Sequence, residues 1–189
     1  MIQFKRKKVI WLTTTALFVA MIIGVQAAGA ALGQFVAGPL VNLMLILSVV
    51  TGGPASGLMA ALLSPVFAKL LGIGPLWGIV PFIMAGNAAL VLVWHAGGKL
   101  RFNRHAARVI TLVAAAVCKF AVLYIGVARV AVPLILALPE PQATVVSNMF
   151  ALPQLFTALA GGALAMGVLP VIERIRGTPV TPLASSAPS

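Results

Sequence analysis

Long apolar runs alternate with short segments rich in glycine, proline or basic residues along this chain. The first run, 9–28, carries no charged residue. At about 20 residues, or roughly 30 Å of helix, it matches the hydrocarbon thickness of a bilayer. A membrane barrel would show shorter segments with alternating residues. We therefore predict six transmembrane helices, over about 9–28, 39–50, 54–71, 79–95, 109–136 and 146–172.

The connections between these runs contain the residues that favour turns. We expect loops at 29–38, 51–54, 72–78 and 138–142, and one long polar connection at 97–108. Part of 29–38 could instead belong to the second helix, which is otherwise short for a membrane crossing. The end of the chain is rich in Pro, Ser and Thr and has no apolar periodicity, which is typical of a disordered tail. The predicted organisation is a basic N-terminus, a membrane domain and a tail, over 1–8, 9–172 and 173–189.

Composition places the chain in the bilayer. Of its residues 61% are apolar and 8% are charged, and the mean hydropathy is +1.12. A soluble fold could not bury so much apolar surface, so we predict an all-α, multi-pass integral protein of the cell (plasma) membrane. The single cysteine, Cys118, excludes an intramolecular disulfide.

The distribution of charge predicts the topology. The chain has 13 Lys and Arg against 2 acidic residues, and the bases cluster in 5–8, in 99–108 and at Arg174 and Arg176. Because cytoplasmic segments of membrane proteins carry an excess of Lys and Arg, six helices with both termini in the cytoplasm place all three clusters on one side. The same rule accounts for the net charge of +11, so no nucleic-acid partner is expected.

One face of the first predicted helix is made of small residues. Ala16, Ala20 and Gly24 recur at every fourth position, and such a row allows close approach of a second helix in lipid. The partner could be another protein or another helix of the same chain. The basic start, the apolar run and the small residues at 28–30 also fit a cleaved signal peptide.

Polar residues inside the apolar runs indicate a binding site. Lys119 lies near the midplane, where a charged group costs at least ~2.5 kcal/mol, so it should face the bundle or a cavity. It could contact a ligand or a structural partner, and Arg129 could instead reach the interface. In the predicted topology most polar residues fall in the outer half, as expected for a mostly apolar small-molecule cavity, although each could merely join helices. The candidate binding residues are Gln34, Trp77, Asn87, Lys119, Tyr124, Arg129, Asn148 and Gln154.

The sequence lacks the residues that several kinds of metal binding, catalysis and nucleotide binding require. The acids Glu140 and Glu173 lie outside the predicted helices, which argues against acid-coordinated metals, paired-carboxylate catalysis and a carrier coupled to a membrane carboxylate. The segment Gly97-Gly98-Lys99 lacks the rest of a phosphate-binding loop. We therefore expect no catalytic residue, no metal site and no cofactor of its own.

The chain resembles the substrate-binding membrane subunit, or S component, of energy-coupling factor (ECF) vitamin transporters. The resemblance covers about 12–172 and rests on the order and spacing of Ala16-Leu-Phe-Val-Ala20, Gly38-Pro-Leu-Val-Asn-Leu43, Leu63-Ser-Pro65, Gly74-Pro-Leu-Trp-Gly-Ile-Val-Pro-Phe82, Gly86-Asn87, Lys119-Phe120, Leu152-Pro-Gln-Leu-Phe-Thr157 and Gly161-Gly162.

This resemblance implies six helices with both termini in the cytoplasm and a vitamin captured from outside. It also implies association with a membrane coupling protein and two cytoplasmic ATPases, which alone use ATP. The face with Ala16, Ala20 and Gly24 would contact the coupling protein, and the loaded subunit would topple to deliver its vitamin. Similarity to individual members suggests a pyrimidine- or pyridoxine-type compound or cobalamin. A self-sufficient carrier or channel, and a structural subunit without ligand, are the alternatives.

Overall fold

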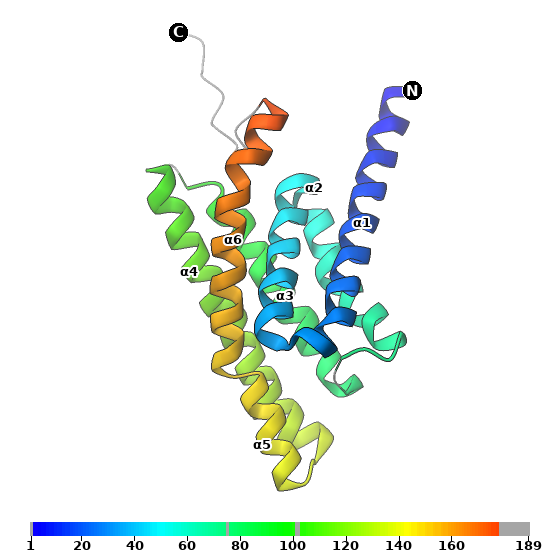
Figure 1. The fold of residues 1–189 in the computed structure, drawn as a ribbon, viewed down its shortest axis with the longest axis vertical. Helices are drawn as coiled ribbons and strands as arrows, with labels where there is room; N and C mark the ends of the chain where they lie inside the picture. Colours follow the sequence, from blue (N-terminus) through cyan, green and yellow to red (C-terminus); the bar gives the residue numbers. More distant parts are fainter. Residues whose placement is uncertain (1, 75, 101–102, 178–189) are drawn as a thin grey trace.

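The computed structural model describes residues 2–74, 76–100 and 103–177, and every regular element in these ranges is a helix (Figure 1). In chain order they are α1 (Ile2–Leu32), α2 (Gln34–Leu70), η1 (Trp77–Ile79), α3 (Val80–Gly97), α4 (Arg104–Leu123), η2 (Tyr124–Leu136), α5 (Glu140–Met149) and α6 (Leu152–Arg176). Here η1 is a short 3₁₀ helix and η2 is a π-helix. The predicted all-α class is confirmed.

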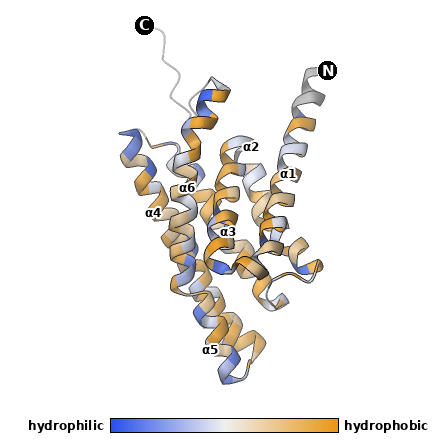
Figure 2. Cartoon of the chain, viewed as in Figure 1, coloured by the Kyte–Doolittle hydropathy of each residue, from blue (hydrophilic) through white to orange (hydrophobic). Residues whose placement is uncertain are grey.

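Five helical segments in these ranges are long and apolar enough to cross a membrane. They are Lys8–Gly29, Gln34–Leu70, Trp77–Gly97, Arg104–Leu136 and Glu140–Ile175. Many large apolar side chains on their surfaces are exposed, and hydrophilic residues gather near the ends of α4 and α6 (Figure 2). This surface is suited to lipid contact.

The second of these segments is divided at Gly53. Gly53 has φ 82° and ψ 177°, which is not helical. A Cβ built on Gly57 would lie 2.8 Å from Cβ of Val49, whereas residues eight apart in a straight helix are roughly 12 Å apart. The chain therefore reverses here, and α2 consists of two arms, each roughly 25 to 28 Å long. The turn predicted at 51–54 is confirmed.

The loop predicted at 29–38 is wrong, because Gly33 alone separates α1 from α2. Gly33 has φ 76° and ends α1, while α2 already begins at Gln34. The small residues of this segment are of types common in loops, but here they allow helices to pack closely. A Cβ on Gly38 would lie 2.7 Å from the Thr157 side chain, so Gly38 lets α6 approach α2.

Two other predicted boundaries also shift. Helix α4 starts at Arg104, inside the predicted polar connection, because the Asn103 side chain accepts hydrogen bonds from the backbone N–H groups of His105 (3.0 Å) and Ala106 (3.4 Å). The helix predicted at 146–172 is interrupted at Phe150 and Ala151. Pro153, in the first turn of α6, favours a new helix start there.

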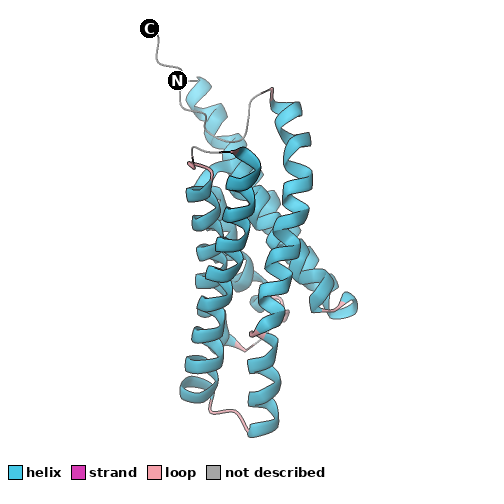
Figure 3. Ribbon diagram, turned by 90° about the vertical axis from the view of Figure 1, so that its left-hand side faces the viewer, coloured by secondary structure: helices cyan, strands magenta, loops and turns pink. Residues whose placement is uncertain are grey.

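The start of α1 and the end of α6 lie at the same end of the bundle, and Figure 3 shows one helix crossing the others at an angle (Figures 1 and 3). At this end Glu173 on α6 forms ion pairs with Arg104 and with Arg108 (2.5 Å for Arg108), which fixes α6 to α4. Helix α6 continues to Arg176, past the predicted start of the tail. The rest of that tail, 178–189, lies outside the described residues.

The main core lies between α1, α2, α3, α4 and α6. It includes the fully buried side chains of Ile22, Leu45, Ile46, Leu90 and Val91. A second apolar cluster joins η1, η2 and α5 around Ile79, Leu123, Val127 and Phe150. Between the two clusters the bundle holds the polar residues that form the candidate site.

Candidate functional site

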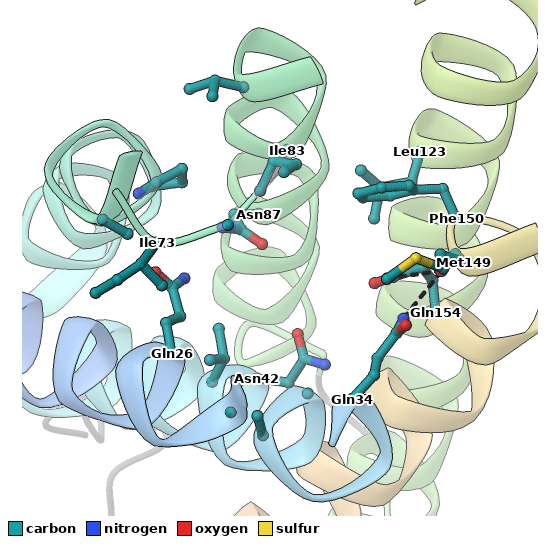
Figure 4. A pocket seen from close by; sticks show the side chains of 18 of the residues that line it. Gln26, Gln34, Asn42, Ile73, Ile83, Asn87, Leu123, Met149, Phe150 and Gln154 are labelled. Carbon is teal, nitrogen blue, oxygen red and sulfur yellow. Dashed lines mark hydrogen bonds between the residues drawn. The ribbon is translucent and has the colours of Figure 1, made fainter. Parts of the chain in front are cut away.

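A cavity of about 540 Å³ opens between the helices (Figure 4). Its wall includes Gly29, Gly72 and Gly74, from the α1–α2 and α2–α3 connections, which places it away from the turn at Gly53. Most of the lining is apolar. The polar lining residues are Gln26, Gln34, Asn42, Asn87, Lys119 and Gln154.

A buried lysine held by two amides forms part of this wall. The ammonium of Lys119 on α4 donates hydrogen bonds to Oδ1 of Asn42 on α2 (2.6 Å) and to Oδ1 of Asn87 on α3 (2.7 Å). Lys119 is 4% exposed, and each asparagine is 1% exposed. A lysine ammonium only donates, so both amide oxygens must face it and both NH₂ groups point elsewhere.

Two glycines allow the helices to approach closely beside this cluster. A Cβ on Gly161 of α6 would lie 2.5 Å from the Pro39 carbonyl oxygen and 2.6 Å from Cβ of Asn42. A Cβ on Gly86 of α3 would lie 2.7 Å from Cγ of Leu123 on α4. Close helix contact at small residues is the usual packing device in membranes. Here it fixes the positions of Asn42 and of the α3 turn that carries Asn87.

No side-chain carboxylate reaches the cavity. The sequence contains only two acidic residues. Glu140 is exposed on α5, and Glu173 is bound to Arg104 and Arg108. The hydrogen-bond partners of Lys119 are therefore neutral, although a buried cation is costly without an opposite charge. When Lys119 is protonated, the site therefore carries a positive charge that no described side chain neutralises.

Two glutamines fix the junction between α5 and α6 at the cavity wall. The side-chain NH₂ groups of Gln34 (2.9 Å) and Gln154 (3.1 Å) both donate to the carbonyl oxygen of Met149 (Figure 4). This carbonyl lies in the last turn of α5, where no further helical N–H is present to pair with it. The start of α2 is thereby joined to the last two helices.

Two buried polar atoms in the cavity wall have no hydrogen-bond partner among the described residues. They are Oε1 of Gln26, an acceptor, and Nδ2 of Asn87, a donor. Buried polar groups are normally paired, so these two atoms are suited to contact a bound molecule. The sequence prediction missed Gln26 and Asn42 as site residues. Each has an amide side chain within an apolar run, which is the feature of the sequence that could have identified it as a site residue.

Of the predicted binding residues, Gln34, Asn87, Lys119 and Gln154 line the cavity. The others lie elsewhere in the described structure. Trp77 and Asn148 are exposed, on η1 and α5. Tyr124 stacks on Phe120, with ring centroids 5.7 Å apart, and the Arg129 guanidinium lies 5.6 Å from the Tyr124 centroid. Hydrogen bonds in a π-helix join residues five apart, so η2 puts Tyr124 and Arg129 on one side, where they contact each other.

The small-residue row of α1 lies on the outside of the bundle. Ala16, Ala20 and Gly24 are exposed, and a Cβ on Gly24 would meet no described atom within 4 Å. The opposite face of α1 packs inward, where the hydroxyls of Thr15 and Ser56 share a hydrogen bond of 2.8 Å. Packing of the row against another described helix of the same chain is therefore not observed.

The parts of the chain that the structure describes contain no group of three or more His, Cys, Asp or Glu side chains placed to hold a metal ion. The side chains that line the cavity offer hydrogen bonds, one lysine and apolar contacts to a bound molecule. Comparisons of the chain with models of protein families, with curated proteins and with solved structures found no match.

Proposed function

We propose that this chain is the substrate-binding membrane subunit of an ECF-type importer and that it captures a vitamin or vitamin precursor in its cavity. The observation that carries the proposal is the cavity itself, which is mostly apolar and contains a lysine held by two asparagines. Small-molecule sites combine an apolar lining with a few fixed polar groups in this manner. Binding needs no catalytic residue and no cofactor of the chain, and ATP would be used by partner subunits alone.

The proposed topology has six membrane crossings, made by α1, the two arms of α2, α3, α4 with η2, and α5 with α6. The reversal at Gly53 supports counting α2 twice. Arg104, Arg108 and Arg174 lie at the same end as the start of α1 and the end of α6, so the positive-inside rule favours a cytoplasmic location for that end. Two isolated basic residues lie outside this group, Lys69 in the last turn of α2 and Arg129 in η2. In the cell membrane the cavity would then open outward.

The size of the cavity favours a small ligand. A volume of about 540 Å³ falls within the range of roughly 300 to 1,000 Å³ that is typical of drug-sized ligands. A pyrimidine- or pyridoxine-type compound fits this range better than cobalamin, whose macrocycle with its nucleotide loop is far larger. We therefore favour a ligand with one or two rings.

The exposed row on α1 is the proposed contact with a membrane coupling protein. Ala16, Ala20 and Gly24 leave a smooth strip on which a partner helix can approach closely. Two cytoplasmic ATPases bound to that coupling protein would supply the energy. Toppling of the loaded subunit in the bilayer would bring the cavity to the inner side.

Purification of the tagged chain from its native membranes in mild detergent tests this function. We expect a coupling protein and two ATPases to copurify, and the substitution Ala20→Trp to remove them. Met21→Trp is the control, because Met21 is also exposed on α1 but lies outside the row. Proteoliposomes that contain the chain alone and accumulate a vitamin without ATP would overturn the proposal in favour of a self-sufficient carrier.

A further inference from the structure

The charge of the cavity is unbalanced within the chain. Lys119 is the only basic residue in the cavity lining, and none of its described partners is anionic. The two acidic side chains of the sequence, Glu140 and Glu173, lie outside the cavity. Among the described residues nothing neutralises a protonated Lys119, so a molecule that enters the cavity is the available source of an opposite charge.

The hydrogen-bonding groups beside Lys119 are donors. Both asparagine oxygens accept from the ammonium, which leaves one ammonium N–H and the amide NH₂ groups for other partners. Asn87 lines the cavity, and its Nδ2 is buried and has no partner among the described residues. This part of the wall consequently binds an acceptor with several lone pairs and repels a cation.

The unpaired acceptor lies on a different helix. Oε1 of Gln26 on α1 is buried and needs an N–H or O–H donor. Figure 4 shows Gln26 and Asn87 reaching the cavity from different helices. A ligand that satisfies both atoms carries its acceptor group and its donor at separate positions on an otherwise apolar body.

We propose that the ligand is a small organic monocarboxylate whose carboxylate contacts Lys119 and Asn87 while an N–H or O–H of the same molecule donates to Gln26. One negative charge matches the single lysine, whereas a phosphate would bring up to two charges to it. The carboxylate also offers about four lone-pair sites to the donors of Lys119 and Asn87. This inference rests on the proposed function, since it names the class of substrate for the same cavity.

A competition among matched acids and neutral analogues tests the inference. The purified full chain is incubated with an equimolar mixture of pantothenate and panthenol, and biotin and its primary amide, together with pyridoxine, thiamin and riboflavin. After washing, retained compounds are quantified by mass spectrometry. We expect at least one acid to be retained at least tenfold over its neutral partner.

Two substitutions test whether Lys119 causes this preference. Lys119→Gln removes the charge but keeps a donor, and Asn87→Asp supplies an internal carboxylate at the position that now lies 2.7 Å from the ammonium. We expect either variant to lower the ratio of acid to neutral analogue at least tenfold. Gln142→Glu is the control, since it adds a carboxylate at an exposed position of α5 and should leave the ratio unchanged. Thermal unfolding of each variant in detergent confirms that it is folded.

The outcomes separate this inference from the proposed function. Retention of a neutral analogue, pyridoxine, thiamin or riboflavin in place of the acids overturns the carboxylate but agrees with a vitamin-binding subunit. An acid preference that survives in folded Lys119→Gln also overturns the inference. Retention of no compound counts against both. Retention of an acid by a chain that copurifies with no ATPase supports the inference and contradicts the function.

Discussion

Lys119 on α4 donates a hydrogen bond of 2.6 Å to Asn42 on α2, 77 positions earlier in the chain. Both side chains are almost completely buried. Because Asn87 on α3 accepts a second hydrogen bond from the same ammonium, one cation joins three helices inside an apolar bundle. The position of the cation depends on all three helices, and the stability of the bundle depends on the two amides.

Replacing Asn42 by leucine, which has a similar volume, should lower the free energy of unfolding by about 2 to 4 kcal/mol, because a buried charge loses one of its neutral partners. Thermal or denaturant unfolding in detergent measures the change. Asn148→Leu, at an exposed position of α5, is the control and should be nearly neutral. Adding Lys119→Met to Asn42→Leu should recover part of the loss, and a further loss in the double variant would contradict the role of the charge.

Gly53→Ala should destabilise the bundle by about 1 to 3 kcal/mol, since φ 82° with ψ 177° is a conformation adopted almost only by glycine. A Cβ at Gly53 would meet no described atom within 4 Å, so the effect would be conformational. Gly167→Ala on α6 is the matched control. It also has open space around its Cβ, but in a helix, and should cause no loss of stability. Equal effects of the two substitutions would count against a fixed reversal at Gly53.

Adjacent glycines of α6 should respond differently to alanine. A Cβ on Gly161 would meet the Pro39 backbone at 2.5 Å, whereas a Cβ on Gly162 would meet the end of the Leu112 side chain at 2.0 Å. Backbone of a packed helix cannot move aside, but a leucine side chain can change its rotamer. We expect Gly161→Ala to reduce both the unfolding midpoint and ligand retention, with a smaller effect of Gly162→Ala. The reverse order would contradict the close packing of α6 on α2.

Accessibility labelling tests the proposed topology. In a Cys118→Ser background, which removes the single native cysteine, a membrane-impermeant maleimide should label Trp77→Cys on intact cells. Asn103→Cys, at the opposite end of the bundle, should react only after permeabilisation. Both native side chains are exposed, so the difference reports the side of the membrane. Labelling of Asn103→Cys on intact cells would place the cavity on the inner side.

The sequence pattern predicts much of the fold because helix length and turn residues are local properties. The turn at Gly53 and the all-helical class follow from them. The short connection at Gly33 does not, because glycine serves both turns and close helix packing, and only the position of Thr157 shows that Gly38 belongs to the second kind. Asn103 is a similar case, because asparagine occurs both in loops and at helix starts. Only the hydrogen bond from the His105 N–H shows that Asn103 caps α4.

The candidate site could be predicted in part, because a polar residue within an apolar run can be recognised from the sequence. Lys119 and Asn87 stand out as polar groups in apolar runs, and both line the cavity. Tyr124 and Arg129 carry the same signal but contact each other, because the π-helical geometry of η2 changes which residues share a side. Asn42 is identified as part of the site only when three helices are brought together around the ammonium.

The most direct test of the account is native mass spectrometry of the full chain purified from its own membranes. We expect a fraction of the protein to carry one additional small molecule of vitamin size, and Ile73→Trp, which fills the cavity from the α2–α3 connection, to abolish it. Leu76→Trp, at an exposed position of that connection, should retain it. A wild-type protein that carries no such molecule and gains none after incubation with the vitamin mixture would contradict the claim that this cavity captures a substrate.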